Sequence, residues 1–290
     1  MKKRKVAFFN IILQGSENVN EMKVCLANVL QYIHSLQPVE RKEDLSSERF
    51  CFLDNLQVTE GGKYSKLLFK SARHSYRAPL LDKETISARE NPKRITEGEQ
   101  MKTHAVVRYF EDKIVMILEQ GSNCMTNGNI ARYLNSFLGQ YNQANPEQTI
   151  NGTFIAQPVL KEDFFEQLQA MRRVMKAVII TDKRILGSDS LNYMQRTSSI
   201  KKEVSINISV NRGGSMKEAI IDAWNTFNAG VTEIACIRVE GEGEHKEKTI
   251  INTEQFAKIE YVEANQNEDT GEFVTSEMFS WMMLIAQRYV

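Results

Sequence analysis

The sequence has no long apolar run. No window approaches the roughly 18 consecutive apolar residues of a membrane-spanning helix, so we expect no membrane span and a cytoplasmic location. Residues 1–16 combine basic residues with an apolar run, as a secretion signal does. However, Asn10 and Gln14 interrupt that run and no small-residue cleavage site follows. These residues are therefore expected to form a first β-strand.

Cysteine is scarce and scattered. The four cysteines are Cys25, Cys51, Cys124 and Cys236. They form no CxxC pair and have no histidine at metal-ligand spacing, which predicts free thiols in a reducing compartment. We expect neither a disulfide framework nor a metal, and the sequence predicts no cofactor.

Recognisable catalytic motifs are also missing. No GxSxG elbow is present. The segments GSDS (187–190) and NRGGS (211–215) complete neither a P-loop nor a dinucleotide fingerprint. NRGGSMK could seat one phosphate before a helix N-terminus, but an ordinary strand-to-helix connection explains it as well. We therefore predict no catalytic residue.

Apolar periodicity predicts both helices and strands. Helical spacing predicts helices at 19–36, 129–141, 216–227 and 275–288, and β-rich runs predict strands at 5–13, 50–58, 64–72, 104–120 (a hairpin), 152–160, 175–183, 203–211, 232–242 and 256–264. Helices and strands follow no strict βαβ period, which favours an α+β fold of mixed or antiparallel sheets with packed helices. The polar linker 141–150 divides an N-terminal domain, 1–145, from a C-terminal domain, 150–290.

The charges balance in number but not in distribution. The chain has 37 basic and 37 acidic residues. KYSKLLFKSARHSYR, residues 63–77, nevertheless contains no acid and interleaves its cations with aromatic residues. A second basic stretch spans 172–202, and the chain beyond Glu233 is mainly acidic. Such segregation can create a positive face on a neutral protein.

The two basic stretches predict a groove for nucleic acid. Lysine and arginine neutralise phosphates, and aromatic rings stack on bases. The predicted contacts are Lys63, Lys66, Lys70, Arg73, Arg77, Arg172, Arg173, Lys176, Lys201, Lys202 and Arg212. An alternative is that each run is an ordinary solvated surface whose aromatic residues face the core.

Two other functions stay open. A metal-dependent nuclease would need acids beside these cations, and Glu244 and Glu247 are the candidates. A protein-interaction subunit of a defence complex would dock its partner on the C-terminal helix through Phe279, Trp281 and Met282. Those three residues would equally suit a core or a homodimer contact.

Several segments resemble a known family. The hairpin AVVRYFEDKIVMILEQ and the following helix NIARYLNSFL resemble the middle of the RexA phage-exclusion proteins. Their C-terminal domain is similar to the run EVSINISVN, MKEAIIDAWNTF, TEIACIRVEGE, FAKIEYVEA and EMFSWMMLIAQRYV. KwaB of the Kiwa anti-phage systems is similar more distantly.

The resemblance covers roughly residues 100–290 and carries expectations about function. It implies a two-domain homodimer that binds double-stranded DNA with little sequence preference. The implied role is antiviral defence, by phage exclusion or abortive infection, with a second defence-system protein as a further candidate partner. It transfers no catalytic residue and no individual DNA contact.

Overall fold

The computed structural model describes most of the chain. The described residues are 1–16, 18–159, 163–182, 203–211, 213–228, 234–243, 248–252 and 259–289. Helices are interspersed among antiparallel strands, which confirms the predicted α+β class. No helix in these ranges is long and apolar enough to cross a membrane.

The chain forms two compact units. The first comprises Met1–Ala156 and Ile259–Val290, and the second Gln157–Lys258. The sequence placed everything from residue 150 onward in one C-terminal domain. In the structure, the last 32 residues of the chain lie with the first unit, because strand β14 pairs along β1.

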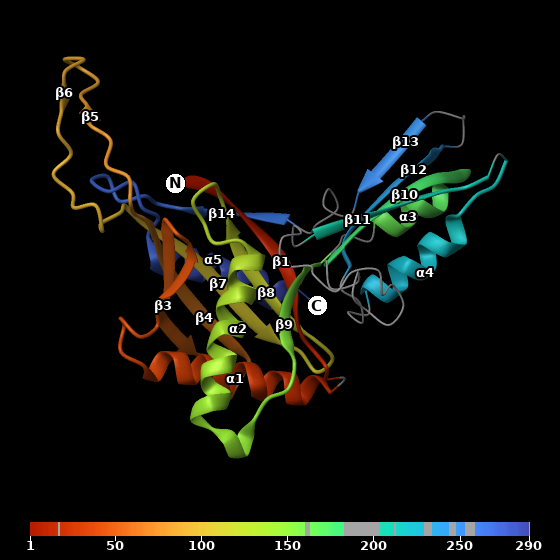
Figure 1. Cartoon of the computed structure of the whole chain (residues 1–290), viewed down its shortest axis with the longest axis horizontal. Helices are drawn as coiled ribbons and strands as arrows, with labels where there is room; N and C mark the ends of the chain where they lie inside the picture. The colour runs from red at the N-terminus through yellow and green to blue at the C-terminus, as the bar shows by residue number, and fades with distance from the viewer. Residues whose placement is uncertain are drawn as a thin grey trace. The chain divides into compact units, whose positions relative to one another are not determined.

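One antiparallel sheet organises the first unit (Figure 1). Its strands are β1 (Lys2–Gln14), β2 (Glu43–Ser46), β3 (Arg49–Val58), β4 (Tyr64–Arg73), β7 (Gln100–Tyr109), β8 (Ile114–Gln120), β9 (Thr153–Pro158) and β14 (Ile259–Ala264). The order is β14-β1-β8-β7-β4-β3-β2, and β9 pairs with β1 outside this path. The predicted hairpins β3–β4 and β7–β8 are both present, joined by short turns.

Helices α1 (Val19–Ser35) and α2 (Asn127–Ala144) cover one face of this sheet. The Asn18 side chain caps α1, and the Thr126 side chain caps α2. Apolar residues at helical spacing face inward, among them Leu26, Leu30 and Ile33 of α1. They pack on Phe69 and the other apolar residues of the strands, which forms the main core. After α2, a short 3₁₀ turn (Pro146–Gln148) leads into β9.

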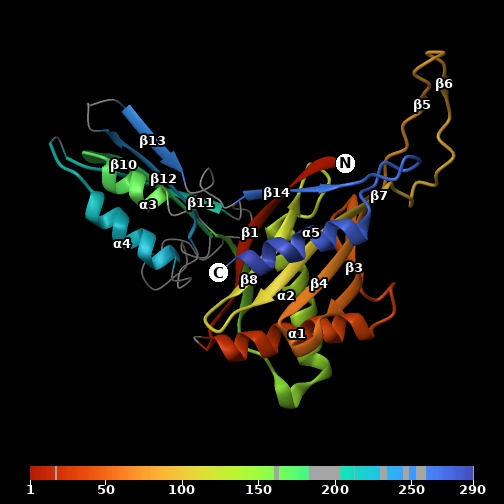
Figure 2. The same ribbon diagram turned by 180° about the vertical axis from the view of Figure 1, so that it is seen from behind.

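Helix α5 (Thr275–Arg288) packs on the opposite face, as the view from behind shows (Figure 2). It buries Met278, Phe279, Met282, Ile285 and Ala286, whereas the third docking candidate, Trp281, is 42% exposed. The Arg108 guanidinium donates to the Ala286 carbonyl at the helix C-terminus, where a cation is favourable.

A long arm separates β4 from β7. We use the name arm for residues 74–99. It extends away from the sheet in Figure 1 and contains two short paired strands, β5 (Leu80–Leu81) and β6 (Ala88–Arg89). The turn that joins β3 to β4 lies at the opposite end of β4 from the arm and is a short 3₁₀ segment, Glu60–Gly62.

The second unit has its own sheet and core. The strands are β10 (Arg173–Asp182), β11 (Glu203–Ser209), β12 (Ile234–Glu242) and β13 (Lys248–Asn252), in the order β11-β10-β12-β13. Helices α3 (Asp163–Ala170) and α4 (Lys217–Asn228) pack through stacked Phe164 and Trp224 rings, whose centroids are 4.5 Å apart. Strand β13 lies in the acidic segment for which the sequence predicted no strand.

Candidate functional site

The predicted nucleic-acid contacts are divided between the two units. Lys63, Lys66, Lys70, Arg73 and Arg77 belong to the first unit, and Arg172, Arg173 and Lys176 to the second. Lys201, Lys202 and Arg212 lie outside the described residues, as do the nuclease candidates Glu244 and Glu247. The predicted contacts therefore form two separate groups, one in each unit.

Strand alternation sorts the basic stretch of β4 onto two faces. Leu67 and Phe69 point into the core under α1 and α2. Lys66 and Lys70 point to the opposite face, which α5 partly covers, because successive side chains of a strand alternate. The Lys66 ammonium lies 6.0 Å from the Phe279 ring centroid of α5, within range of a cation–π attraction.

The strand register places Lys102 of β7 beside Lys70 of β4. Lys70 is directly opposite Phe52 on β3 and directly opposite Lys102 on β7. Like charges at such cross-strand positions destabilise a sheet. We call Lys66, Lys70 and Lys102 the lysine row; the half-buried Phe52 side chain lies at its edge.

Two carboxylates at the rim offset the charge of the row. Asp54 lies 3.1 Å from Lys70, and Glu272, in the loop before α5, lies 2.7 Å from Lys102. The hydrogen bond from Lys102 and the nearby charge of Lys70 lower the pKa of Glu272, so it is ionised at neutral pH. Lys66 has no ion pair with any described residue. Three cations thus face two anions.

The remaining cations of 63–77 have other surroundings. Arg73 pairs with Glu48 at 3.0 Å, and Arg77 pairs with Glu90 at 3.6 Å while donating to the Asn91 carbonyl. These contacts hold the base of the arm. Lys63 is exposed beside the β3–β4 turn. The basic stretch therefore does not act as one surface, because acids distant in sequence neutralise its second half.

In the second unit, the basic strand lies next to an acidic one. Arg172 is 3.9 Å from Glu242, and Lys176 is opposite Glu240 in the β10–β12 register. Arg173 donates to the Gly214 carbonyl. The basic and acidic stretches that are separate in sequence thus pair in space, which works against a broad positive surface here.

Two residues of the candidate site were missed by the sequence prediction. Lys102 lies just before residue 104, where the predicted hairpin begins, so the sequence did not assign it to a strand. Phe52 was assigned only to a strand. The alternation of side chains along β3, β4 and β7 shows which residues of each strand share a face. Only the register between the strands shows that Phe52 and Lys102 lie opposite Lys70.

A buried polar network lies under the first turn of α5. Glu119 accepts from Arg4 Nε at 2.6 Å and lies 2.7 Å from His104 Nδ1, and His104 Nε2 is 3.1 Å from the Thr275 hydroxyl. Burial opposes ionisation of Glu119, but His104 and Arg4 outweigh it and lower its pKa. This order of acid, histidine and hydroxyl occurs in hydrolases. Here His104 is 1% exposed, so the network serves to anchor α5.

Burial governs the chemistry of the cysteine thiols. All four cysteines are free, as predicted. Burial raises the pKa of Cys124 to about 11 and that of Cys51 to about 12, which makes both thiols unreactive at neutral pH. Within the described ranges, no group of three or more potential ligands is placed to hold a metal ion.

Comparison with known proteins assigns no family or function to these residues. The chain matches no family model, and no curated protein matches it significantly.

Proposed function

We propose that the chain is a nucleic-acid-binding protein whose first unit contacts phosphates through the lysine row. The observation that carries this proposal is the cross-strand pair Lys70–Lys102, with Lys66 on the same face. A sheet gains nothing from adjacent like charges, whereas a polyanion would bind both. The side chains of Lys70 and Lys102 are each 25% exposed, and those of their partners Asp54 and Glu272 are 29% and 28% exposed. Phosphates could replace these carboxylates.

The spacing of the row suits a phosphate backbone. Lys66 and Lys70 are four residues apart on one strand, which corresponds to about 13 Å. One strand of a DNA duplex presents about four phosphates over that length. Lysine contacts to phosphate carry no sequence information, so we expect binding to depend little on sequence.

Double-stranded DNA, a homodimer and a role in phage exclusion are the expectations from the RexA resemblance, and we retain them as parts of this proposal. A dimer would supply two lysine rows, which raises affinity through multivalency. The Phe52 ring would add stacking on any unpaired base.

A mobility-shift titration with an unrelated DNA duplex across a salt series tests the proposal. With three phosphate contacts, the logarithm of the binding constant should fall with the logarithm of salt concentration at a slope of about −2.7 for each row. The triple change Lys66→Glu, Lys70→Glu and Lys102→Glu should abolish the shift. Including Mg²⁺ shows whether the DNA is cleaved, as a nuclease would require.

The matched control is Arg94→Glu. Arg94 is exposed and paired with Glu97 in the arm, so this variant should bind DNA like the parent. Parent-like binding by the triple variant would overturn the proposal.

A further inference from the structure

The arm ends in a well-defined tip that exposes two aliphatic side chains. Leu81 is 66% exposed and Ile86 is 70% exposed. Between them, the Asp82 carboxylate accepts hydrogen bonds from the Glu84 and Thr85 backbone N–H groups at 2.9 and 2.8 Å. The Ile86 N–H donates to the Asp82 carbonyl at 2.9 Å. The turn thus holds both aliphatic side chains outward.

The backbone at the tip is unusual. Ile86 has a φ of 57°, a left-handed conformation that β-branched residues rarely adopt. Such conformations persist where the surroundings impose them and cluster at binding sites. A two-stranded hairpin such as β5–β6 is also only marginally stable alone in water. Both observations indicate that the tip is used against another molecule.

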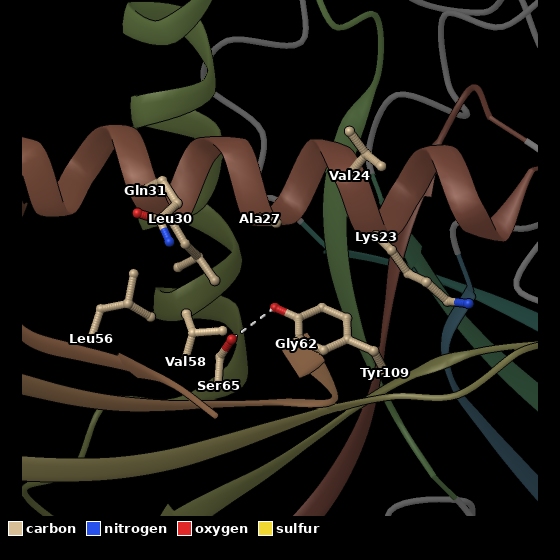
Figure 3. Close-up of a pocket in the computed structure, with 10 residues that line it drawn as sticks. All are labelled: Lys23, Val24, Ala27, Leu30, Gln31, Leu56, Val58, Gly62, Ser65 and Tyr109. Atoms are coloured by element: carbon tan, nitrogen blue, oxygen red, sulfur yellow. Dashed lines mark hydrogen bonds between the residues drawn. The ribbon is translucent and has the colours of Figure 1, made fainter. Parts of the chain in front are cut away.

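The same unit contains an apolar pocket of about 260 Å³ between α1 and the end of the β3–β4 hairpin (Figure 3). Its lining includes Ala27, Leu30, Leu56, Val58, Ser65 and Tyr109. The Ser65 and Tyr109 hydroxyls hydrogen-bond to each other at 3.1 Å, so the polar groups of the floor are satisfied. An apolar cavity of about 150 Å³ already accepts benzene, and this pocket has room for two branched aliphatic side chains.

We propose that the tip of one copy inserts Leu81 and Ile86 into this pocket of a second copy, and that the exchange is reciprocal. The inference builds on the homodimer proposed above but is independent of DNA binding. Each chain supplies both a projecting tip and a pocket, which is what a closed two-fold contact needs.

The placement of the two features excludes contact within one chain. The arm leaves the sheet at the Arg73 end of β4, whereas the pocket lies at the Ser65 end. The arm also points away from the sheet (Figure 1). In an antiparallel pair of copies, each arm end lies beside the partner's pocket end.

The charges at the two surfaces are complementary. The tip carries Asp82 and Glu84, accompanied by one lysine, and hydrogen bonds from Thr85 and Glu84 lower the pKa of Asp82. The pocket rim carries Lys23, whose ammonium donates to the Asn20 side chain and the Glu111 carbonyl, and the exposed Lys63 follows the rim residue Gly62. Docking would place acids beside cations around an apolar centre, the usual anatomy of an interface.

Sedimentation of the full-length chain without nucleic acid tests the proposal. We expect a dimer in the parent. Replacing both tip residues, Leu81→Asp with Ile86→Asp, should raise the dimer dissociation constant by about 100-fold or more. Ala27→Phe, which fills the pocket and leaves the tip intact, should have the same effect. The control Val39→Asp changes a residue that is 79% exposed and outside both surfaces, and should leave the dimer unchanged.

Disulfide trapping identifies the contact directly. A mixture of an Ile86→Cys chain and a Val58→Cys chain should form a mixed disulfide on oxidation, whereas Ile86→Cys with Val39→Cys should not. Equal trapping at both positions would overturn the proposal. A monomeric parent, or a dimer that survives both the tip and the pocket changes, would overturn it too and assign the tip to a different partner.

Discussion

Glu119 shows how much one buried side chain holds together. Its carboxylate joins Arg4 on β1 to His104 on β7, and His104 in turn contacts Thr275 at the start of α5. A buried charge that loses its partner is costly, so these residues stabilise one another. The N-terminal strand and the C-terminal helix are thereby linked through a single group.

Glu119→Gln should destabilise the protein and change its pH dependence. Losing two charge-assisted hydrogen bonds should cost about 3 kcal/mol at neutral pH. The folded pKa of Glu119 is lowered, so the parent has this stabilisation fully above the unfolded pKa of about 4.3. The parent loses it as the pH falls through the lower folded value. Urea unfolding between pH 7 and pH 3 measures both effects.

The control for this experiment is Glu147→Gln, which changes an exposed glutamate. It should follow the parent at every pH. If Glu119→Gln also follows the parent, the network contributes nothing to stability.

For single residues, the sequence showed which side chains are charged but not which residues surround them in the fold. The sequence predicted a strand at 64–72, but its imperfect alternation did not separate Phe69, which faces the core, from the lysines. It could not indicate that Glu48 and Glu90 neutralise Arg73 and Arg77, because those pairs depend on the tertiary fold. Lys102 was missed for the same reason, since only the β4–β7 register places it beside Lys70.

At the scale of elements, the position of the arm depends on close backbone packing at its base. Gly98, at its base, lies so close to Arg73 that an added Cβ would be 2.1 Å from the Arg73 carbonyl oxygen. Backbone cannot yield as a flexible side chain can. A glycine is therefore required where the arm returns to the sheet.

Gly98→Ala should displace the base of the arm and destabilise the first unit by about 1–3 kcal/mol. The matched change is Gly139→Ala in α2, where a Cβ would have no neighbour within 4 Å. That variant should gain up to about 1 kcal/mol, because alanine is the better helix former. Denaturant unfolding of the two variants should thus shift in opposite directions, and a shared direction would contradict this account.

The elements that were predicted best are those with strong periodicity. Helices α1, α2 and α5 and both hairpins follow from apolar spacing and turn residues, and lie close to their expected bounds. The arm and β13 were not predicted as strands. Their polar sequences lack an alternating apolar face, and short strands of this kind exist only because a partner strand is adjacent.

For the whole molecule, the second unit is an insertion in the first. Strands β9 and β14 flank it in sequence, and both pair with β1. The polar residues 141–150 predicted the boundary because polar linkers commonly separate domains. The return of β14 to β1 was not predictable, because pairing between strands about 250 residues apart leaves no local signal.

Deleting the insertion tests this organisation. A chain that joins Ala156 to Ile259 through a short Gly/Ser linker should still fold, because the core of the first unit and the α5 contacts are retained. Circular dichroism and urea unfolding should show one cooperative transition, with a smaller m-value because less surface is buried. An unfolded or aggregated product would show that the second unit is needed for the first to fold.

The pairing of β14 with β1 also affects what a protease cut would do to the protein. The peptide backbone enters the second unit once and leaves it once, so a single protease cut there would split the chain without separating the sheet. The C-terminal fragment would keep β14 hydrogen-bonded to β1 and α5 buried against β7. The two fragments would then migrate together on a native gel and separate only in detergent.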